Sequence, residues 1–308
     1  MQYRTDLAME RVTEGSSISG VRMENASLGD FSRNIVTIET DEAARHLQKA
    51  KGRYITFHTR PLKTLDAASV GEFARLIAGS LKHLLPPEGD ILIVGLGNRR
   101  ITSDALGSRV ADTVLVTRHL KGVLPSSLFG RLRGVCALSP GVLGVTGMET
   151  KDIVRGAVMH AKPAAVIAVD ALAARECSRI GTTVQLSDTG IQPGSGVGNH
   201  RQGLTKETLG VPVISMGVPL VVYTSVIVRD ALQLILNNIE ESEDEKEAMA
   251  DSLSRKITAE ELGEMVVTPR EIDELVASLS NLLALSLNTA LQPRLSEEEI
   301  TLLTHETL

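Results

Sequence analysis

Two aspartates, Asp104 and Asp170, stand where a pair of carboxylates could activate water. Each follows an apolar run that predicts a buried strand, residues 91–96 before the first and 164–169 before the second. Open α/β sheets place their sites at the carboxyl ends of parallel strands. Two carboxylates held close together share a proton, so one can deprotonate water while the other protonates a leaving group. The alternative is that Asp104 only starts a helix and Asp170 only caps one.

A third acid, Asp188, follows the predicted strand 182–186 and stands in the triplet Asp-Thr-Gly. This triplet is the active one of pepsin-like and retroviral proteases, which are rich in β-structure and need two copies of it. The present chain has one copy, in a strand–helix setting. We therefore expect Asp188 to support the site or to bind substrate, and we expect the three acid-bearing segments to meet over one cleft.

Two glycine-rich stretches, 95–98 and 194–199, resemble phosphate-binding loops without completing the pattern. The third glycine position of G-x-G-x-x-G is Arg100 in the first stretch and Asn199 in the second. Nucleotide binding is therefore poorly supported. Glycines also allow tight turns and a close approach of backbone, and exposed loop backbone can bind an extended peptide. The residues expected to hold substrate backbone are Gly95, Gly97, Asn98, Gly194, Gly196 and Asn199.

Other nucleophiles are weakly indicated. Cys136 and Cys177 form no Cys-x-x-Cys pair and lie in or beside apolar segments, which is typical of buried free thiols. Ser195 lies in a glycine-rich loop and not in a G-x-S-x-G elbow. A metal could be held by Asp104 and Asp170 with His119 or His200. No His-x-x-x-His or H-E-x-x-H pair is present, however, and we expect no metal and no cofactor.

Composition argues weakly against several classes of partner. The chain has 308 residues, of which 43% are hydrophobic and 23% charged, an ordinary balance for a globular protein. Aromatic residues make up 2% and the net charge is −6, so neither base stacking nor a phosphate-binding footprint is evident. No secretory signal and no apolar run of about 20 residues are found. We expect a cytoplasmic protein with no nucleic-acid or membrane partner.

The elements that must position the acids alternate between strand and helix through the middle of the chain. Such alternation predicts a mostly parallel sheet with helices on both faces. The predicted strands are 91–96, 135–138, 164–169, 182–186 and 211–218. The predicted helices are 104–120, 150–161, 171–180 and 221–236.

The flanking segments complete one predicted domain over residues 1–308, with its catalytic core at 88–236. Residues 1–33 are polar and indicate an arm, and strands at 35–39 and 53–58 predict a small antiparallel patch before a helix at 65–85. The acidic stretch 237–265 is either a solvated helix or a linker. Helices are expected in 266–308, the first capped by Thr268 with Pro269 at its first position.

Several motifs together resemble the germination proteases of endospore-forming bacteria. They occur in collinear order and cover nearly the whole chain. They include Arg4-Thr5-Asp6-Leu7-Ala8, Gly95-Leu96-Gly97-Asn98, Asp104-Ala105-Leu106-Gly107, Thr117-Arg118-His119-Leu120, Asp170-Ala171-Leu172-Ala173-Ala174-Arg175, SDTGIQPGSGVGN, GVPVISMGVP and MVVTPREID.

The resemblance implies an endopeptidase that degrades small acid-soluble spore proteins in the spore core during germination. It implies an inactive homotetrameric zymogen that trims its own N-terminus, and cleavage between Asp6 and Leu7 is our hypothesis for this chain. It also implies a three-layer α/β/α fold, similar to hydrogenase maturation endopeptidases, and places the catalytic pair on Asp104 and Asp170. The alternatives are a metal-dependent peptidase using the same aspartates and a non-enzymatic module that binds nucleotides or peptides.

Overall fold

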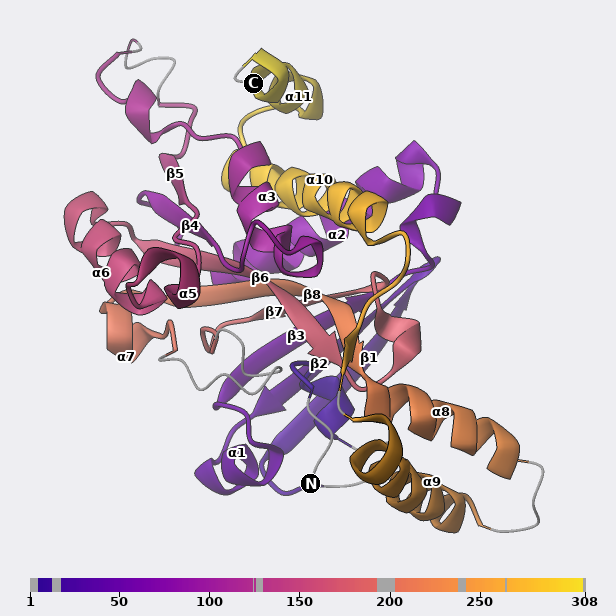
Figure 1. The fold of residues 1–308 in the computed structure, drawn as a ribbon. Helices are drawn as coiled ribbons and strands as arrows, with labels where there is room; N and C mark the ends of the chain where they lie inside the picture. The colour runs from indigo at the N-terminus through magenta and orange to yellow at the C-terminus, as the bar shows by residue number, and fades with distance from the viewer. Residues whose placement is uncertain are drawn as a thin grey trace.

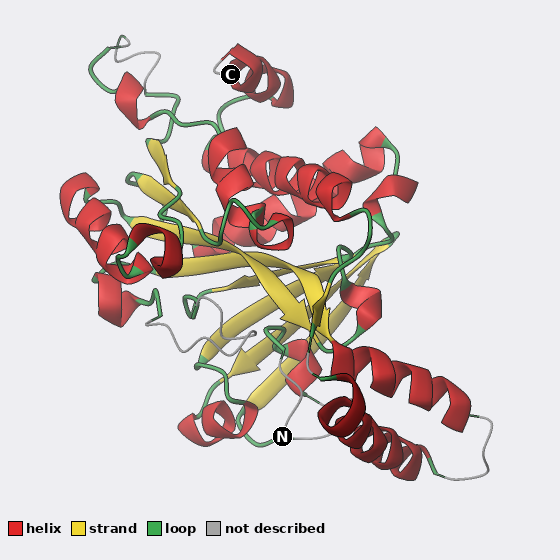
Figure 2. Cartoon of the chain, in the orientation of Figure 1, coloured by secondary structure: helices red, strands yellow, loops and turns green. Residues whose placement is uncertain are grey.

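A single sheet forms the centre of the computed structural model, which describes residues 5–12, 18–123, 125, 130–192, 203–237, 242–263 and 265–306. The described strands follow the order β1-β2-β3-β7-β8-β6-β4-β5, and β9 pairs with β8 beside this path. Helices cover both faces of the sheet (Figures 1 and 2). The chain therefore has the predicted α/β class.

One half of the sheet is parallel and the other half is antiparallel. The parallel half consists of β4 (Ile91–Gly95), β5 (Val135–Leu138), β6 (Ala165–Ala174) and β8 (Val213–Tyr223). The antiparallel half consists of β1 (Val21–Leu28), β2 (Phe31–Ile38), β3 (Gly52–His58) and β7 (Thr183–Ser187), with the short β9 (Val266–Val267) on β8. The predicted antiparallel patch is thus confirmed, and it continues the main sheet through the pairing of β3 with β7.

Three helices cover one face of the sheet and bury the largest apolar cluster. They are α2 (Ala67–Leu84), α3 (Leu106–Thr113) and α10 (Ile272–Leu291). Phe73 and Ile77 of α2 are fully buried, as is Leu283 of α10. By length and composition α10 could cross a membrane, but it packs against α2 and α3 within the chain. That burial gives its apolar side chains partners inside the molecule.

The opposite face carries two smaller apolar clusters. Val154 and Val158 of α6 (Thr150–Ala161) pack on the parallel strands, together with Leu209 of α7 (Lys206–Leu209). Near the other end of the sheet, α1 (Asp41–Leu47) and the N-terminal segment pack on β2 and β3.

The remaining elements lie around these layers. Helices α8 (Thr224–Leu236) and α9 (Glu243–Ile257) pack against each other and project from the body of the molecule (Figure 1). The acidic stretch 237–265 is therefore largely helical, which is the first of the two forms predicted for it. The short elements are α5 (Leu143–Thr146), α11 (Glu297–Glu306), the 3₁₀ turns Met9–Arg11, Leu62–Thr64, Thr102–Asp104, Arg118–Leu120 and Cys177–Arg179, and the π turn Thr258–Leu262.

Several predicted boundaries are wrong; strand β8, for example, extends to Tyr223, past its predicted end at 218, and α8 therefore begins only at Thr224. Strand β6 continues through Asp170 to Ala174, where a helix over 171–180 was expected, because these residues pair with β8 and strand pairing overrides the helix propensity of alanine. Helix α3 covers only Leu106–Thr113 of the predicted 104–120, since Asp104 lies in the 3₁₀ turn 102–104 and a second 3₁₀ turn occupies 118–120. Helix α10 begins at Ile272, while the Thr268 hydroxyl donates to the Leu220 carbonyl instead of capping a helix.

Candidate active site

Asp104 is held by the glycine loop that follows β4. The Asn98 N–H donates to Oδ2 of Asp104 at 2.7 Å, so the carboxylate folds back onto the loop. Gly97 has a φ of +99°, and a Cβ built there would lie 1.9 Å from the Asp104 carbonyl oxygen. A residue with a side chain would be strained at this position and would collide with that carbonyl. The residue type at position 97 therefore fixes where Asp104 lies.

Two further glycines let the turn that carries Asp104 lie directly on the sheet. A Cβ on Gly95 would lie 2.1 Å from the Gly107 carbonyl oxygen, and one on Gly107 would lie 2.2 Å from the Val169 carbonyl oxygen. The beginning of α3 thus touches β4 and β6 backbone to backbone. This close approach brings the 3₁₀ turn 102–104 against β6 and β8.

Asp170 lies within β6 and is 5% exposed. Its Oδ1 accepts the Ala171 N–H at 3.0 Å, and its backbone is in register with Gly217 of β8. The preceding residue, Val169, accepts the Leu96 N–H at 2.8 Å, so the end of β4 runs alongside Asp170. The structure therefore places the segments of Asp104 and Asp170 next to each other, at the carboxyl edge of β4.

Asp188 lies elsewhere, and the expectation that all three acids meet is wrong. Strand β7 pairs antiparallel with β8, so Asp188 follows the Ser187–Ser215 pair toward the amino end of β8. Its Oδ1 accepts the Arg53 N–H at 2.8 Å, which ties it to β3. The physical reason is the short connection 175–182, since a parallel crossover needs a dozen or more residues.

Part of the predicted site falls outside the described residues. This applies to Gly194, Gly196 and Asn199, and also to Ser195 and His200.

The two cysteines do not have the character of nucleophiles. Both are free and half-buried. Burial and the nearby Asp230 carboxylate raise the pKa of Cys177 to about 11, and burial raises the pKa of Cys136. A raised pKa keeps a thiol protonated at neutral pH, whereas the thiolate is the reactive form.

The described residues contain no group of three or more His, Cys, Asp and Glu side chains arranged to hold a metal ion. Among the histidines named above, His119 is exposed in the 3₁₀ turn Arg118–Leu120. The structure thus does not bring it into a ligand set with Asp104 and Asp170.

The N-terminal segment lies against β6, where it contacts Ala173, three residues after Asp170. The Asp6 N–H donates to the Ala173 carbonyl at 3.0 Å, and Oδ2 of Asp6 accepts the Ala173 N–H at 2.9 Å. The Leu7 side chain is fully buried. The Asp6–Leu7 bond, our hypothetical processing site, is therefore held three residues along β6 from Asp170.

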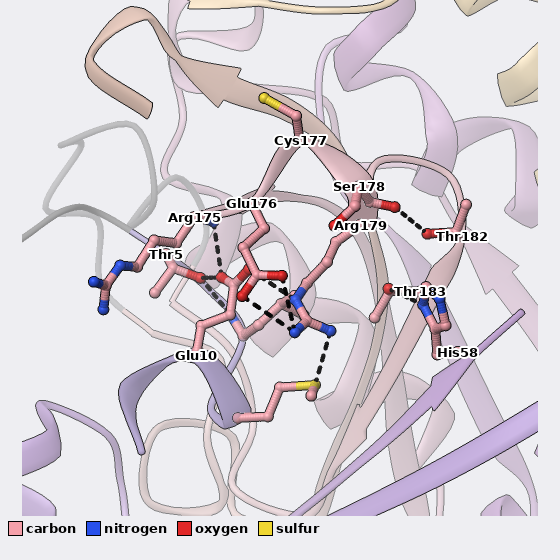
Figure 3. Close-up of polar contacts among 12 residues, drawn as sticks. Thr5, Glu10, His58, Arg175, Glu176, Cys177, Ser178, Arg179, Thr182 and Thr183 are labelled. Carbon is pink, nitrogen blue, oxygen red and sulfur yellow. Dashed lines mark hydrogen bonds and ion pairs between the residues drawn. The ribbon is translucent and has the colours of Figure 1, made fainter. Parts of the chain in front are cut away.

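A buried carboxylate, Glu10, anchors this segment (Figure 3). It accepts the Arg175 N–H at 2.8 Å and the Thr5 hydroxyl, and it pairs with Nε of Arg179 at 3.1 Å. Burial, the largest influence, raises the pKa of Glu10. Sequence analysis missed this network because its members come from segments far apart in the chain. The only signal in the sequence was Glu10 itself, a single acid in the polar stretch 1–33.

Comparison with known proteins identifies relatives along nearly the whole chain. The model of a family described as germination protease matches residues 3–261. A germination protease of Clostridium perfringens is 40% identical, covering 96% of this chain and 97% of the relative. One from Clostridium acetobutylicum is 39% identical with the same coverage, and one from Bacillus cereus is 35% identical, covering 98% of this chain and 97% of the relative.

A solved structure matches more weakly. The [NiFe] hydrogenase maturation protease HycI of Thermococcus kodakarensis aligns with a TM-score of 0.31 and 21% sequence identity, covering 58% of this chain and 96% of that protein. A likeness of this strength carries no conclusion about activity.

Proposed function

The chain belongs to the germination protease family, and from this premise we propose that it is an endopeptidase in which Asp104 and Asp170 together activate water. The family membership itself supports a peptidase that acts in spore germination. The observation that supports the finer proposal is the meeting of two acid-bearing segments at the carboxyl edge of β4. There, the Leu96 N–H bonds to Val169 and the turn carrying Asp104 lies on β6.

The proposed reaction uses the two carboxylates in different protonation states. The ionised one takes a proton from water as the water oxygen attacks the scissile carbonyl carbon. The protonated one supports the carbonyl oxygen and then protonates the leaving amine. The glycine loop around Gly97 and Asn98, which positions Asp104, would hold the substrate backbone beside the pair.

We further propose the substrate, processing and assembly that the sequence resemblance implies. The substrates would be small acid-soluble spore proteins in the spore core, and the chain would be made as a zymogen that cuts itself between Asp6 and Leu7. It would assemble as a homotetramer. The exposed side chains of Leu234 and Ile235 on the projecting helix α8 offer apolar area for such self-association. Measuring the molecular mass of the assembly in solution tests the homotetramer.

Incubation of the purified chain with a small acid-soluble spore protein tests this proposal. We expect discrete substrate fragments, and a loss from the enzyme of the mass of residues 1–6. Intact substrate after prolonged incubation with the processed enzyme would contradict the proposed activity. A mature chain that cleaves substrate but still starts at Met1 would contradict only the processing site.

Chelator treatment of already processed enzyme separates the aspartic mechanism from the metal-dependent one. Activity that survives removal of metal, checked by elemental analysis, is the result expected for water held between two carboxylates. Activity that disappears and returns with an added divalent cation would assign the same aspartates to a metal.

A further inference from the structure

Two side-chain donors converge on one carbonyl oxygen of the N-terminal segment. The Asp6 carbonyl oxygen accepts Nζ of Lys49 at 2.8 Å and Nε2 of Gln185 at 3.1 Å. Lys49 follows α1, whereas Gln185 lies in the middle of β7. The two donors thus come from separate elements, and both form hydrogen bonds with the carbonyl oxygen of the Asp6–Leu7 peptide bond.

The nitrogen side of the same bond is held as well. The Leu7 N–H donates to the Thr5 hydroxyl oxygen at 3.0 Å, and that hydroxyl donates to the Glu10 carboxylate. The next amide, that of Ala8, donates to Oε1 of Gln185 at 2.8 Å. The Gln185 side chain therefore spans the bond, donating on one side and accepting on the other.

We propose that Lys49 and Gln185 form the oxyanion site for self-cleavage of the Asp6–Leu7 bond, an inference that rests on the proposed function. Water adds its oxygen to the Asp6 carbonyl carbon, and negative charge develops on the carbonyl oxygen that the two donors hold. The bond from that carbon to the Leu7 nitrogen then breaks. The Leu7 nitrogen gains both protons of the attacking water and becomes an α-ammonium group, Asp6 gains a free α-carboxylate, and both donors keep their own protons.

The environment of this contact suits charge stabilisation better than simple anchoring. The segment is already anchored by the Asp6–Ala173 hydrogen bonds and by Glu10. Burial lowers the pKa of Lys49, the nearby Asp6 carboxylate opposing this in part, so holding an ammonium group here has a cost. Preorganised donors in such surroundings stabilise a developing oxyanion far more than they do in water.

One row of paired residues across β6, β8 and β7 contains both Asp170 and Gln185. Asp170 of β6 is in register with Gly217 of β8, and Gly217 is in register with Gln185 of β7. Residues paired across neighbouring strands project from the same face of a sheet. Asp170 and Gln185 thus project from one face, with only a glycine between them in that row.

The Gln185→Glu variant tests the donor alone. A glutamate keeps an acceptor for the Ala8 N–H but replaces the N–H that donates to the Asp6 carbonyl by a carboxylate oxygen, which repels a developing oxyanion. We expect the full-length variant to lose residues 1–6 on the order of 100-fold more slowly than the wild type, followed by mass spectrometry. Lys49→Met should slow processing similarly. Lys51→Met, which removes an exposed lysine paired with Asp41 at 2.7 Å, should process at the wild-type rate.

A second readout separates this role from anchoring. If Lys49 and Gln185 only anchor the segment, their replacement would raise hydrogen exchange in residues 5–12 and leave processing equal or faster. The proposal predicts retained protection in Gln185→Glu together with slow processing.

Processing at or above the wild-type rate in both variants would overturn it. A wild type that cleaves spore protein but never its own Asp6–Leu7 bond would overturn this inference alone, whereas failure of both cleavages would also overturn the proposed function.

Discussion

At the scale of single residues, the candidate site is set by backbone amides that fix carboxylates. Asp104 accepts the Asn98 N–H and Asp170 accepts the Ala171 N–H, so each side chain is directed by a rigid neighbour. The same device fixes Glu10 through the Arg175 N–H. The two catalytic candidates could be selected from the sequence because each acid follows an apolar run, 91–96 or 164–169. The roles of Lys49, Gln185 and Glu10 could not be predicted from it, since they depend on contacts with residues far along the chain. The separation is 43 residues for Lys49 and more than 160 for Gln185 and Glu10.

The buried Glu10 predicts a pH dependence of stability. Burial raises its pKa in the folded state above the ordinary 4.5, so its contribution to stability is fully present below about pH 4.5 and is lost as the pH rises through the folded pKa. Its charged neighbours are Arg179, which favours ionisation, and Glu176, which opposes it. The Glu10→Gln variant lacks this titration.

We therefore expect the melting temperature of the wild type, relative to that of Glu10→Gln, to fall between pH 4.5 and pH 7. Thermal unfolding of both proteins across this range measures the difference, and titration of all other groups largely cancels. A constant difference would contradict the raised pKa.

At the scale of elements, close glycine contacts position the site. Gly107 is the clearest case, because a Cβ there would lie 2.2 Å from the Val169 carbonyl oxygen and 2.5 Å from the Leu96 nitrogen. Any side chain would push α3 away from the sheet and displace the turn that carries Asp104. Helix α3 is therefore both a core element and the support of a proposed catalytic residue.

The Gly107→Ala variant should lose about 1–3 kcal/mol of unfolding free energy, as is typical of overpacking, together with most of its cleavage activity. Gly156→Ala is the matched control, since that exposed glycine in α6 has open space around it. The control should gain up to about 1 kcal/mol from helix propensity. Chemical denaturation and substrate cleavage are the measurements, and equal stability in the two variants would refute the packing argument.

Element prediction succeeded where local pattern and long-range pairing agree. The strand at 135–138 and the helix at 150–161 have the predicted bounds. It failed at 171–174, where alanines that favour a helix extend β6 beside β8. It also failed for the direction of β7, which is decided by the length of the preceding connection and not by the residues of the strand itself.

At the scale of the whole molecule, one sheet includes the predicted parallel core, the predicted antiparallel patch and part of the predicted arm. The polar stretch predicted to be an arm contains β1, which extends the sheet beside β2. Residues 5–12 lie across β6 and β7 through Asp6 and Ala8. Periodicity cannot reveal such docking, because it depends on which distant strands come together. The proposed processing site thus lies along the same strand, β6, as Asp170 of the proposed catalytic pair.

The most direct test of the account is the cleavage rate of the Asp104→Asn and Asp170→Asn variants on a small acid-soluble spore protein. Both should be produced without residues 1–6, because by this account neither variant could remove them itself, and thermal unfolding should confirm that each keeps the wild-type fold. Because each asparagine preserves shape and removes proton transfer, we expect each variant to lose activity by at least about 100-fold. Wild-type rates in both correctly folded variants would contradict the assignment of Asp104 and Asp170 as the pair that activates water.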